Sequence, residues 1–259
     1  MEKSRRDFLK IGGICALGLS SLDVADAFAK KRVTEFLTNP KAGTAKRWAM
    51  AIDVKKCWNE GNEGCTECIL ACDLAHNIPD IPVKRQEVKW IWNEKYENAF
   101  PGQEESMEPK EVKDKPFMVL CNHCLHAPCV RVCPTQATFK DPDGITMMDF
   151  HRCIGCRYCM AACPYGARSF NWRDPRPYVK KINPDFPTRD RGVVEKCDFC
   201  VERLAIGKIP ACVEACKSKA LIFGDLDDPE SELRKALASR FSIQRKPELG
   251  TMPGVYYLI

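Results

Sequence analysis

The sequence predicts an α+β fold in which short strands and short helices form two pseudo-symmetric units, with inserted loops and a C-terminal extension. Cysteine is strongly enriched, with 17 among 259 residues, and all but Cys15 fall into four quartets. Each quartet ends in a C-x3-C spacing, and a short strand-like run precedes it, so one structural unit recurs along the chain. The quartets are Cys57/Cys65/Cys68/Cys72, Cys121/Cys124/Cys129/Cys133, Cys153/Cys156/Cys159/Cys163 and Cys197/Cys200/Cys212/Cys216.

The third quartet indicates the cofactor. The run from Cys153 to Pro164 reads CIGCRYCMAACP, which has the spacing C-x2-C-x2-C-x3-C-P. This is the bacterial ferredoxin spacing for a [4Fe–4S] cluster, in which the fourth cysteine ligates the second cluster of a pair. Two quartets together therefore predict one bis-[4Fe–4S] ferredoxin-like unit, and the sixteen cysteines predict four [4Fe–4S] clusters.

The distances between quartets predict how they pair. Nineteen residues separate Cys133 from Cys153, whereas 33 separate Cys163 from Cys197 and 48 separate Cys72 from Cys121. We therefore expect a tandem domain over 47–226, with an inner unit at about 115–172 and an outer unit from 47–92 plus 190–226. With the fourth cysteine crossing over, the predicted ligand sets are Cys57/Cys65/Cys68/Cys216, Cys197/Cys200/Cys212/Cys72, Cys121/Cys124/Cys129/Cys163 and Cys153/Cys156/Cys159/Cys133.

The apolar pattern predicts the elements around the first two quartets. Partial alternation predicts strands over 47–54, 83–92 and 115–120, and the polar, Pro-containing stretch 97–116 predicts an exposed loop. Two short runs flank Pro142-Asp143-Gly144 and predict a hairpin, with strands at 138–141 and 145–149.

The last third of the chain predicts a Pro-rich loop at 174–187, a helix beginning within 201–206, and a strand at 220–225. In the C-terminal extension, 227–259, we expect a helix over 231–240, with Asp228 as its N-cap and Pro229 at its first position. The apolar and aromatic end, 245–259, is expected to pack on the core as a strand or tail; the alternative is a docking surface for a partner subunit.

The N-terminus predicts an export signal over 1–29. Residues 4–10 read SRRDFLK, which resembles the twin-arginine signal, with Arg5 and Arg6 as the pair. The apolar stretch 11–22 is too short for a bilayer of about 30 Å, and Ala27-Phe28-Ala29 offers a cleavage site before a linker at 30–46. We therefore expect export to the periplasmic or extracytoplasmic face; retention of the segment as an anchor, or a plain amphipathic helix, are the alternatives.

The formal charge of the chain depends on the cofactor. The sequence alone carries +5, but four oxidised clusters at about −2 each would bring this to about −3. Because no Lys/Arg run with interleaved aromatics is present, we expect no nucleic-acid partner. Two other uses of cysteine remain to be weighed: a disulfide scaffold and structural zinc. Neither explains the spacing of the third quartet.

The complete set of motifs resembles the four-cluster ferredoxin subunits of complex iron–sulfur oxidoreductases of the DMSO and polysulfide reductase type. The matching runs are 121–137, 153–167, 196–203 and 210–216, and the resemblance covers about 47–226. The twin-arginine segment, the run Asn171 to Pro177 and the tail from Gly250 to Tyr257 look most like the DsrO group, the exported ferredoxin subunits of DsrMKJOP membrane complexes. The seven-residue gap after Cys57 departs from the usual spacing of the family.

The resemblance implies a non-catalytic electron-transfer subunit. Its expected partners are an NrfD-type integral membrane subunit that interacts with quinone and a cytochrome c or catalytic oxidoreductase subunit, so the chain would be membrane-associated through its partners. Sulfur-compound respiration is the expected setting. The alternatives are the electron-transfer subunit of a molybdopterin oxidoreductase or nitrite reductase system, and, outside electron transfer, a structural zinc protein. An enzyme with a labile cluster would need an open ligand position, which sixteen cysteines for four clusters do not leave.

Overall fold

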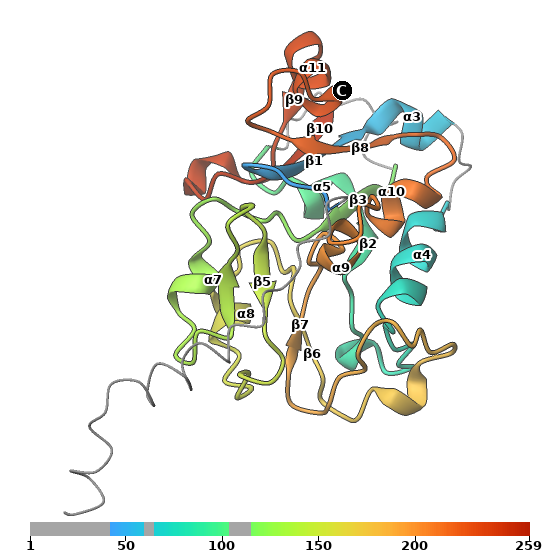
Figure 1. The fold of residues 1–259 in the computed structure, drawn as a ribbon, viewed down its shortest axis with the longest axis vertical. Coiled ribbons are helices and arrows are strands. Elements are labelled where there is room, and N and C mark those ends of the chain that lie inside the picture. Colours follow the sequence, from blue (N-terminus) through green and yellow to red (C-terminus); the bar gives the residue numbers. More distant parts are fainter. Residues whose placement is uncertain (1–41, 60–64, 104–114) are drawn as a thin grey trace, which may run out of the picture. The chain divides into compact units, whose positions relative to one another are not determined.

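A four-stranded sheet joins distant parts of the chain in the computed structural model, which describes residues 42–59, 65–103 and 115–259. The strand order is β8-β1-β10-β9 (Figure 1). Strand β1 (Trp48–Asp53) pairs antiparallel with β8 (Leu221–Asp225) and parallel with β10 (Val255–Leu258), whose other edge pairs with β9 (Ser242–Ile243). The predicted signal segment 1–29 and most of the linker 30–46 lie outside the described residues.

The C-terminal tail packs on the core, as the sequence predicted. Val255, Tyr257 and Leu258 in β10 have no exposed surface, and the Tyr257 hydroxyl donates to the carbonyl of Met118 at 2.9 Å. Burial removes the apolar surface of these side chains from water, which stabilises the fold by about 1.5–3 kcal/mol for each large side chain. The tail is therefore an integral strand of the sheet that begins with β1.

Three two-stranded antiparallel sheets complete the described strands. They are β2 (Ile91–Glu94) with β3 (Phe117–Leu120), β4 (Thr138–Lys140) with β5 (Thr146–Met148), and β6 (Ser169–Phe170) with β7 (Val194–Glu195). The predicted hairpin is confirmed, because β4 and β5 flank Gly144, whose φ of +79° is one that glycine adopts without strain. The strands predicted at 47–54, 115–120 and 220–225 are confirmed as β1, β3 and β8.

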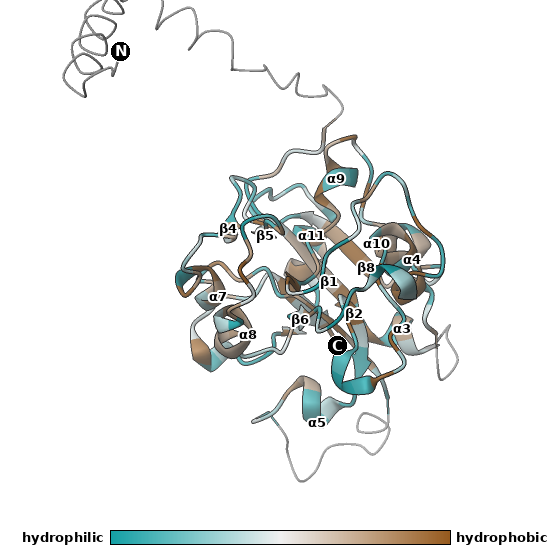
Figure 2. Cartoon of the chain, turned by 90° about the horizontal axis from the view of Figure 1, so that it is seen from below, coloured by the Kyte–Doolittle hydropathy of each residue, from teal (hydrophilic) through white to brown (hydrophobic). Residues whose placement is uncertain are grey.

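The helices are short, and several lie directly beside a quartet. They are α3 (Val54–Asn59), α4 (Glu67–Ala75), α5 (Tyr96–Ala99), α7 (Pro128–Arg131), α8 (Tyr158–Ala162), α9 (Val201–Leu204), α10 (Ala211–Ala215) and α11 (Glu232–Ser239), with 3-10 turns η1 (Lys84–Gln86), η2 (Arg176–Tyr178) and η3 (Pro247–Leu249). Helices of four to nine residues are not stable alone in water, so packing must hold them. Helix α4 packs against α10 (Figure 1), and strands of the four-stranded sheet carry brown, hydrophobic colouring in Figure 2.

Three sequence predictions need correction. The strand expected at 83–92 is a 3-10 turn at Lys84–Gln86 followed by β2, which begins only at Ile91. Helix α5 overlaps the first three residues of the loop expected at 97–116, of which residues 104–114 are outside the described part. Helix α11 begins after Ser231, whose side chain accepts from the Arg234 amide at 3.1 Å, so Ser231 and not Asp228 is the N-cap. Within the described ranges, no helix is long and apolar enough to cross a membrane.

Candidate iron–sulfur centres

A short helix presents the third cysteine of each quartet. Cys68 lies in α4, Cys129 in α7, Cys159 in α8 and Cys212 in α10. Helices α8 and α10 end at the last cysteine of their quartets, where Cys163 and Cys216 adopt extended backbone with ψ of 110° and 98°. The last cysteine is thereby turned out of the helical path. Helix α4 instead continues past Cys72, so Cys68 and Cys72 lie on one face of it.

The backbone repeats where the sequence repeats. In the last three quartets, the residue two positions after the first cysteine and the residue three positions after the last cysteine both have positive φ. These residues are His123 (42°), Gly155 (71°) and Phe199 (59°), then Gln136 (55°), Gly166 (65°) and Lys219 (50°). Only two of the six are glycine, and non-glycine residues at positive φ mark local constraint. The same loop is therefore built three times, each time around a quartet.

These loops direct backbone amides at sulfur. The amides of Thr138 and Ala220 donate to the sulfur atoms of Cys133 and Cys216 at 3.5 and 3.3 Å. The amide of Ala211 reaches Cys200 Sγ at 3.4 Å. Amide donors to ligating sulfur stabilise the reduced, more negative form of an iron–sulfur cluster and so raise its reduction potential. The alanines that follow three of the quartets, Ala137, Ala167 and Ala220, are all buried.

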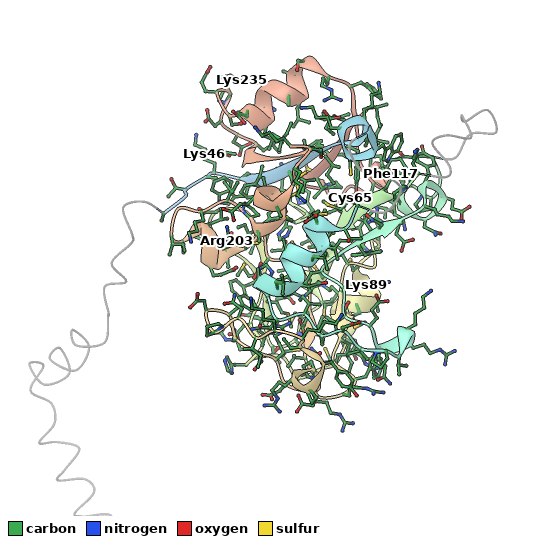
Figure 3. The ribbon with its side chains drawn as sticks, turned by 90° about the vertical axis from the view of Figure 1, so that its right-hand side faces the viewer. Lys46, Cys65, Lys89, Phe117, Arg203 and Lys235 are labelled. Carbon is green, nitrogen blue, oxygen red and sulfur yellow. The ribbon has the colours of Figure 1, made fainter. Side chains whose placement is uncertain are left out.

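Cysteines from the first and last quartets gather at one end of α4. Cys65, labelled in Figure 3, lies two residues before α4 and is exposed, and Cys57, Cys68 and Cys216 are partly buried. Burial, followed by the charges of Cys216 and Cys65, raises the pKa of Cys57 to about 11. Burial also raises the pKa of Cys68 to about 12, with contributions from Cys212, Cys57, Cys216 and Cys65. The structure thus brings Cys57, Cys65, Cys68 and Cys216 close together.

The second group is the most deeply buried. Burial raises the pKa of the Cys72 thiol well above its usual range, and the charges of Cys197, Cys212 and Cys200 add to this effect. Burial raises the pKa of Cys200 as well, followed by the charges of Asp198, Cys212 and Cys197. The packing of α4 on α10 carries Cys72 into this group, away from the other cysteines of its own quartet.

The third group combines the second quartet with the end of α8. Burial raises the pKa of Cys124 to about 12, and Cys121, Cys163 and Cys129 contribute as neighbouring charges. Cys163 has Cys121 and Cys129 as its charged neighbours in turn. The last cysteine of the third quartet therefore lies beside the first three of the second.

The fourth group lines a small cavity, of about 10 Å³. Its wall includes Cys133 with Cys153, Cys156 and Cys159, and Thr138, Met148 and Val194 supply neighbouring surface. Cys133 comes from the end of the second quartet, and the other three come from the third. Cys133 therefore lies beside the first three cysteines of the third quartet.

The donor sets suit [4Fe–4S] clusters chemically. All sixteen thiols are free, and each group offers four sulfur atoms from irregular loops and helix ends. Burial is the main cause that raises the pKa of nine of these thiols, namely Cys57, Cys68, Cys72, Cys124, Cys159, Cys163, Cys197, Cys200 and Cys212, so these nine bind their protons more tightly than a free thiol does. Iron replaces those protons on ligation, which couples cluster binding to folding. Within each group, the chain can hold one cluster.

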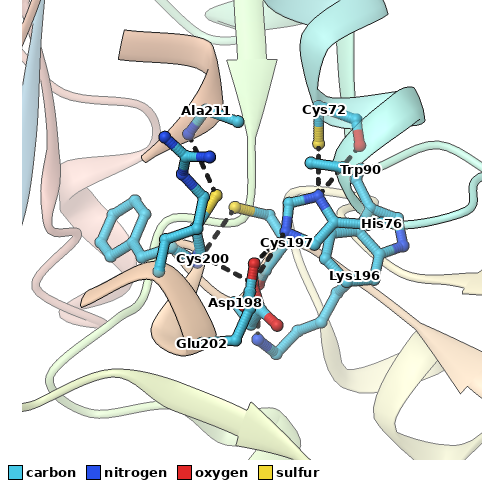
Figure 4. Close-up of polar contacts among 12 residues, drawn as sticks. Cys72, His76, Trp90, Lys196, Cys197, Asp198, Cys200, Glu202 and Ala211 are labelled. Atoms are coloured by element: carbon cyan, nitrogen blue, oxygen red, sulfur yellow. Dashed lines mark hydrogen bonds and ion pairs between the residues drawn. The ribbon is translucent and has the colours of Figure 1, made fainter. Parts of the chain in front are cut away.

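A buried hydrogen-bond network lies beside the second group (Figure 4). His76 is 1 % exposed; its Nδ1 donates to the Cys72 carbonyl at 2.9 Å and lies 3.5 Å from Cys72 Sγ, and its Nε2 donates to Glu202 Oε1 at 3.1 Å. Burial opposes the imidazolium, but the hydrogen bond to Glu202 and the charge of Asp198 outweigh it and raise the pKa of His76. The ring also stacks on Trp90, with centroids 4.5 Å apart.

Three buried charges were not assigned a role from the sequence. Lys196 is 1 % exposed and donates to the carbonyls of Thr146 and Cys197, so it ties the fourth quartet to strand β5. Arg189 and Glu195 form an ion pair at 2.7 Å and are almost wholly inaccessible to solvent. Lys196 could have been noticed because it directly precedes Cys197, but Arg189 lies in a loop with no motif.

Comparison with known proteins gives the family. The model of the 4Fe-4S dicluster domain matches residues 114–226. The chain is 44% identical to "Hdr-like menaquinol oxidoreductase iron-sulfur subunit 1" of Archaeoglobus fulgidus over 98% of this chain and 97% of that protein. The chain belongs to the dicluster iron–sulfur subunits of respiratory oxidoreductases. Another relative is the iron-sulfur cluster-binding subunit of menaquinone reductase from Nitratidesulfovibrio vulgaris. It is 37% identical to this chain over 82% of this chain and 88% of the relative.

A subunit of tetrathionate reductase from Salmonella typhimurium is another member, 36% identical over the whole of this chain and 89% of the relative. These relatives confirm the expectation of [4Fe–4S] cofactors and of a non-catalytic electron-transfer subunit in an oxidoreductase complex. Membership also confirms the mixed α+β ferredoxin-type fold that the quartets predicted.

Proposed function

We propose that this chain conducts single electrons through four [4Fe–4S] clusters, one in each cysteine group, between a quinone-interacting membrane subunit and a redox partner. The observation that carries the proposal is that the four groups adjoin one another in series. Cys68 of the first group has Cys212 of the second as a neighbouring charge. Cys197 of the second group has Cys121 of the third as a neighbour, and Cys159 of the fourth group has Cys129 of the third. The series runs from the first group through the second and third to the fourth.

The ligand sets of the proposal are those that the grouping supports. They are Cys57/Cys65/Cys68/Cys216, Cys72/Cys197/Cys200/Cys212, Cys121/Cys124/Cys129/Cys163 and Cys133/Cys153/Cys156/Cys159. Each cluster, when bound, exchanges one electron with little rearrangement. The residues of the chain hold the cluster iron, donate amide hydrogen bonds to sulfur and exclude water. The second and third quartets form the inner ferredoxin-like unit, and the first and fourth form the outer unit.

The first and fourth groups, at the two ends of the series, are where electrons can pass to and from partner proteins. Cys65 is exposed in the first group, and Cys153 and Cys156 are partly exposed in the fourth, whereas Cys72, Cys197, Cys200 and Cys212 are buried. Electron transfer falls steeply with distance, so partners are expected at the two outermost groups. We place an NrfD-type membrane subunit at one end and a cytochrome c or catalytic subunit at the other.

The finer identity belongs to the proposal as well. The twin-arginine segment and the C-terminal run support the DsrO group and export to the extracytoplasmic face, and a menaquinol oxidoreductase subunit is among the relatives. The second candidate is the electron-transfer subunit of a molybdopterin oxidoreductase or nitrite reductase system. It is supported by the tetrathionate reductase relative and by NrfC of Escherichia coli, 40% identical over 81% of this chain. Purification of the complex from membranes, with identification of the co-purifying subunits, separates these two candidates.

Replacement of Cys163 tests the proposed ligand sets. In reduced protein, Cys163→Ser is expected to abolish the same EPR signal as Cys121→Ser, and a different one from Cys153→Ser, because Cys163 lies beside Cys121. Wild-type protein should contain about sixteen irons per chain. A colourless protein, or zinc in place of iron, would refute the cofactor assignment. Loss of the same signal in the Cys163 and Cys153 variants would refute the crossover alone.

A further inference from the structure

Arg168 lies buried at the junction of the third and fourth cysteine groups. Only 5 % of the residue is exposed, and it sits five positions after Cys163, directly after the buried Ala167. Its Nη1 donates to Thr138 Oγ1 at 3.2 Å and approaches Met148 Sδ at 3.8 Å. Thr138 and Met148 both line the cavity of the fourth group. The guanidinium is therefore held directly behind two residues of the cavity wall.

The charge of Arg168 is balanced by sulfur. Within the described ranges, the structure records no ion pair between Arg168 and a carboxylate, and the polar neighbours of its side chain include the sulfur atoms of Cys129 and Cys159. Burial disfavours the guanidinium, but the charges of Cys129, Cys159 and Cys121 outweigh it and raise the pKa of Arg168. Arg189 is also buried, but unlike Arg168 it forms an ion pair with a carboxylate, that of Glu195, at 2.7 Å. A buried cation without a counter-ion is strongly unfavourable, so anionic sulfur at both groups must compensate it.

The internal repeat indicates that this cation is not needed by the loop itself. The position five residues after the last cysteine holds Asn77, Thr138 and Leu221 in the other three quartets. Thr138 and Leu221 follow the same backbone turn, because Gln136, Gly166 and Lys219 all have positive φ. A neutral side chain therefore satisfies the local geometry, and the arginine must serve another purpose at this one position.

We propose that the positive charge of Arg168 acts on both clusters of the inner unit and raises the reduction potential of each. This inference rests on the four-cluster assignment proposed above. Reduction adds one negative charge to a cluster, and a nearby cation in a low-dielectric interior stabilises the reduced form more than the oxidised form. Because Cys129 and Cys159 belong to different proposed ligand sets, one cation acts on both clusters. It thereby favours the inner unit as the place where electrons reside.

The test is a potentiometric titration of the holoprotein followed by EPR, with signals assigned through Cys121→Ser and Cys153→Ser. Arg168→Gln is neutral and can still reach Thr138, and Arg168→Lys keeps the charge. We expect Arg168→Gln to lower the midpoint potentials of the two inner clusters and to leave the outer two unchanged, and Arg168→Lys to restore most of the shift. Arg176→Gln is the matched control, because it removes the same charge from an exposed position. This variant should change none of the four midpoint potentials.

Several outcomes would overturn the inference. Unchanged potentials in Arg168→Gln, equal shifts in the Gln and Lys variants, or a shift confined to one cluster would each contradict a shared charge. If Arg168→Gln loses about half of the iron while Arg168→Lys retains it, the charge is needed to hold the two inner clusters, which supports the inference; a loss from the outer groups contradicts it. The iron content and number of EPR signals of the wild-type protein test the four-cluster proposal separately.

Discussion

The buried ion pair between Arg189 and Glu195 is expected to be a major contributor to stability. Glu195 has no exposed surface, and its Oε2 accepts from Arg189 Nη2 at 2.7 Å and from Trp90 Nε1 at 3.1 Å, while its Oε1 accepts from Asn171. Arg189 also donates to the carbonyls of His76 and Asn77. The carboxylate therefore contacts three other segments of the chain, and through Arg189 the pair also reaches the two residues that follow α4.

Replacement of Glu195 by leucine leaves Arg189 charged and buried. Removing one partner of a buried pair costs about 3–5 kcal/mol. For a chain of this size, about 2–4 °C of melting temperature corresponds to 1 kcal/mol, so Glu195→Leu should lower the apparent melting temperature by about 6–20 °C. The Arg189→Leu, Glu195→Leu double variant should lose less than the sum of the two single variants, because no unpaired charge remains.

The measurement is differential scanning calorimetry of the anaerobic holoprotein at one fixed scan rate, since unfolding that releases clusters is not two-state. The pair Arg176–Asp174 is the matched control: its N–O separation is also 2.7 Å, but both side chains are about half exposed. Asp174→Leu should leave the melting temperature nearly unchanged. A drop in Asp174→Leu as large as that in Glu195→Leu, or additive losses in the double variant, would show that burial of the pair is not the cause.

Two further predictions concern the loops and the clusters. Gly155→Ala should reduce the iron content and the melting temperature far more than Gly102→Ala. Both positions have positive φ, which strains any residue other than glycine. However, a Cβ at Gly155 would clash with the Gly192 carbonyl oxygen, whereas a Cβ at Gly102 would meet no atom within 4 Å. Similar losses in the two variants would exclude the clash as the cause. Removal of iron by anaerobic chelation should speed amide hydrogen exchange in α7, α8 and α10 much more than in β1 and β10. The reason is that helices of four or five residues depend on ligation. An equal increase of the exchange rate in the helices and the strands would contradict this.

The sequence predicted the [4Fe–4S] cofactor because cysteine spacing is a direct record of ligand geometry, and the four ligand sets stay a prediction. It could not predict how the ends of the chain meet. Strand β10 lies parallel to β1, about 200 residues earlier in the chain, and no local pattern specifies that pairing. The strand expected at 83–92 was misplaced for a related reason: the run Lys84–Gln86 is polar and exposed, and only the pairing with β3 defines where β2 begins.

The buried charges show the same limit at the level of single residues. Arg168, Arg189 and Lys196 are hydrophilic by composition, and a sequence pattern assigns such residues to the surface. Each is buried because a partner that the local sequence pattern does not reveal compensates it: sulfur for Arg168, Glu195 for Arg189, and the Thr146 carbonyl for Lys196. The signal for such sites is a position within the internal repeat where one copy alone carries a charge, as at Arg168.

The nesting of the two proposed units has a consequence for assembly. The inner groups use residues between Cys121 and Cys163, so their loop closures are short. The outer groups require Cys57 and Cys72 to meet Cys216 and Cys197, over more than 120 residues, and the sheet that frames them needs β10 at the end of the chain. Loop closure costs more entropy as the separation grows, and contacts of long separation form slowly. The inner groups also depend on the end of the chain, because the amides of Leu125 and His126 donate to the carbonyls of Met252 and Thr251 at 3.0 Å each. The C-terminal segment that ends in β10 therefore completes both units, and neither has all of its contacts until the last residues are in place.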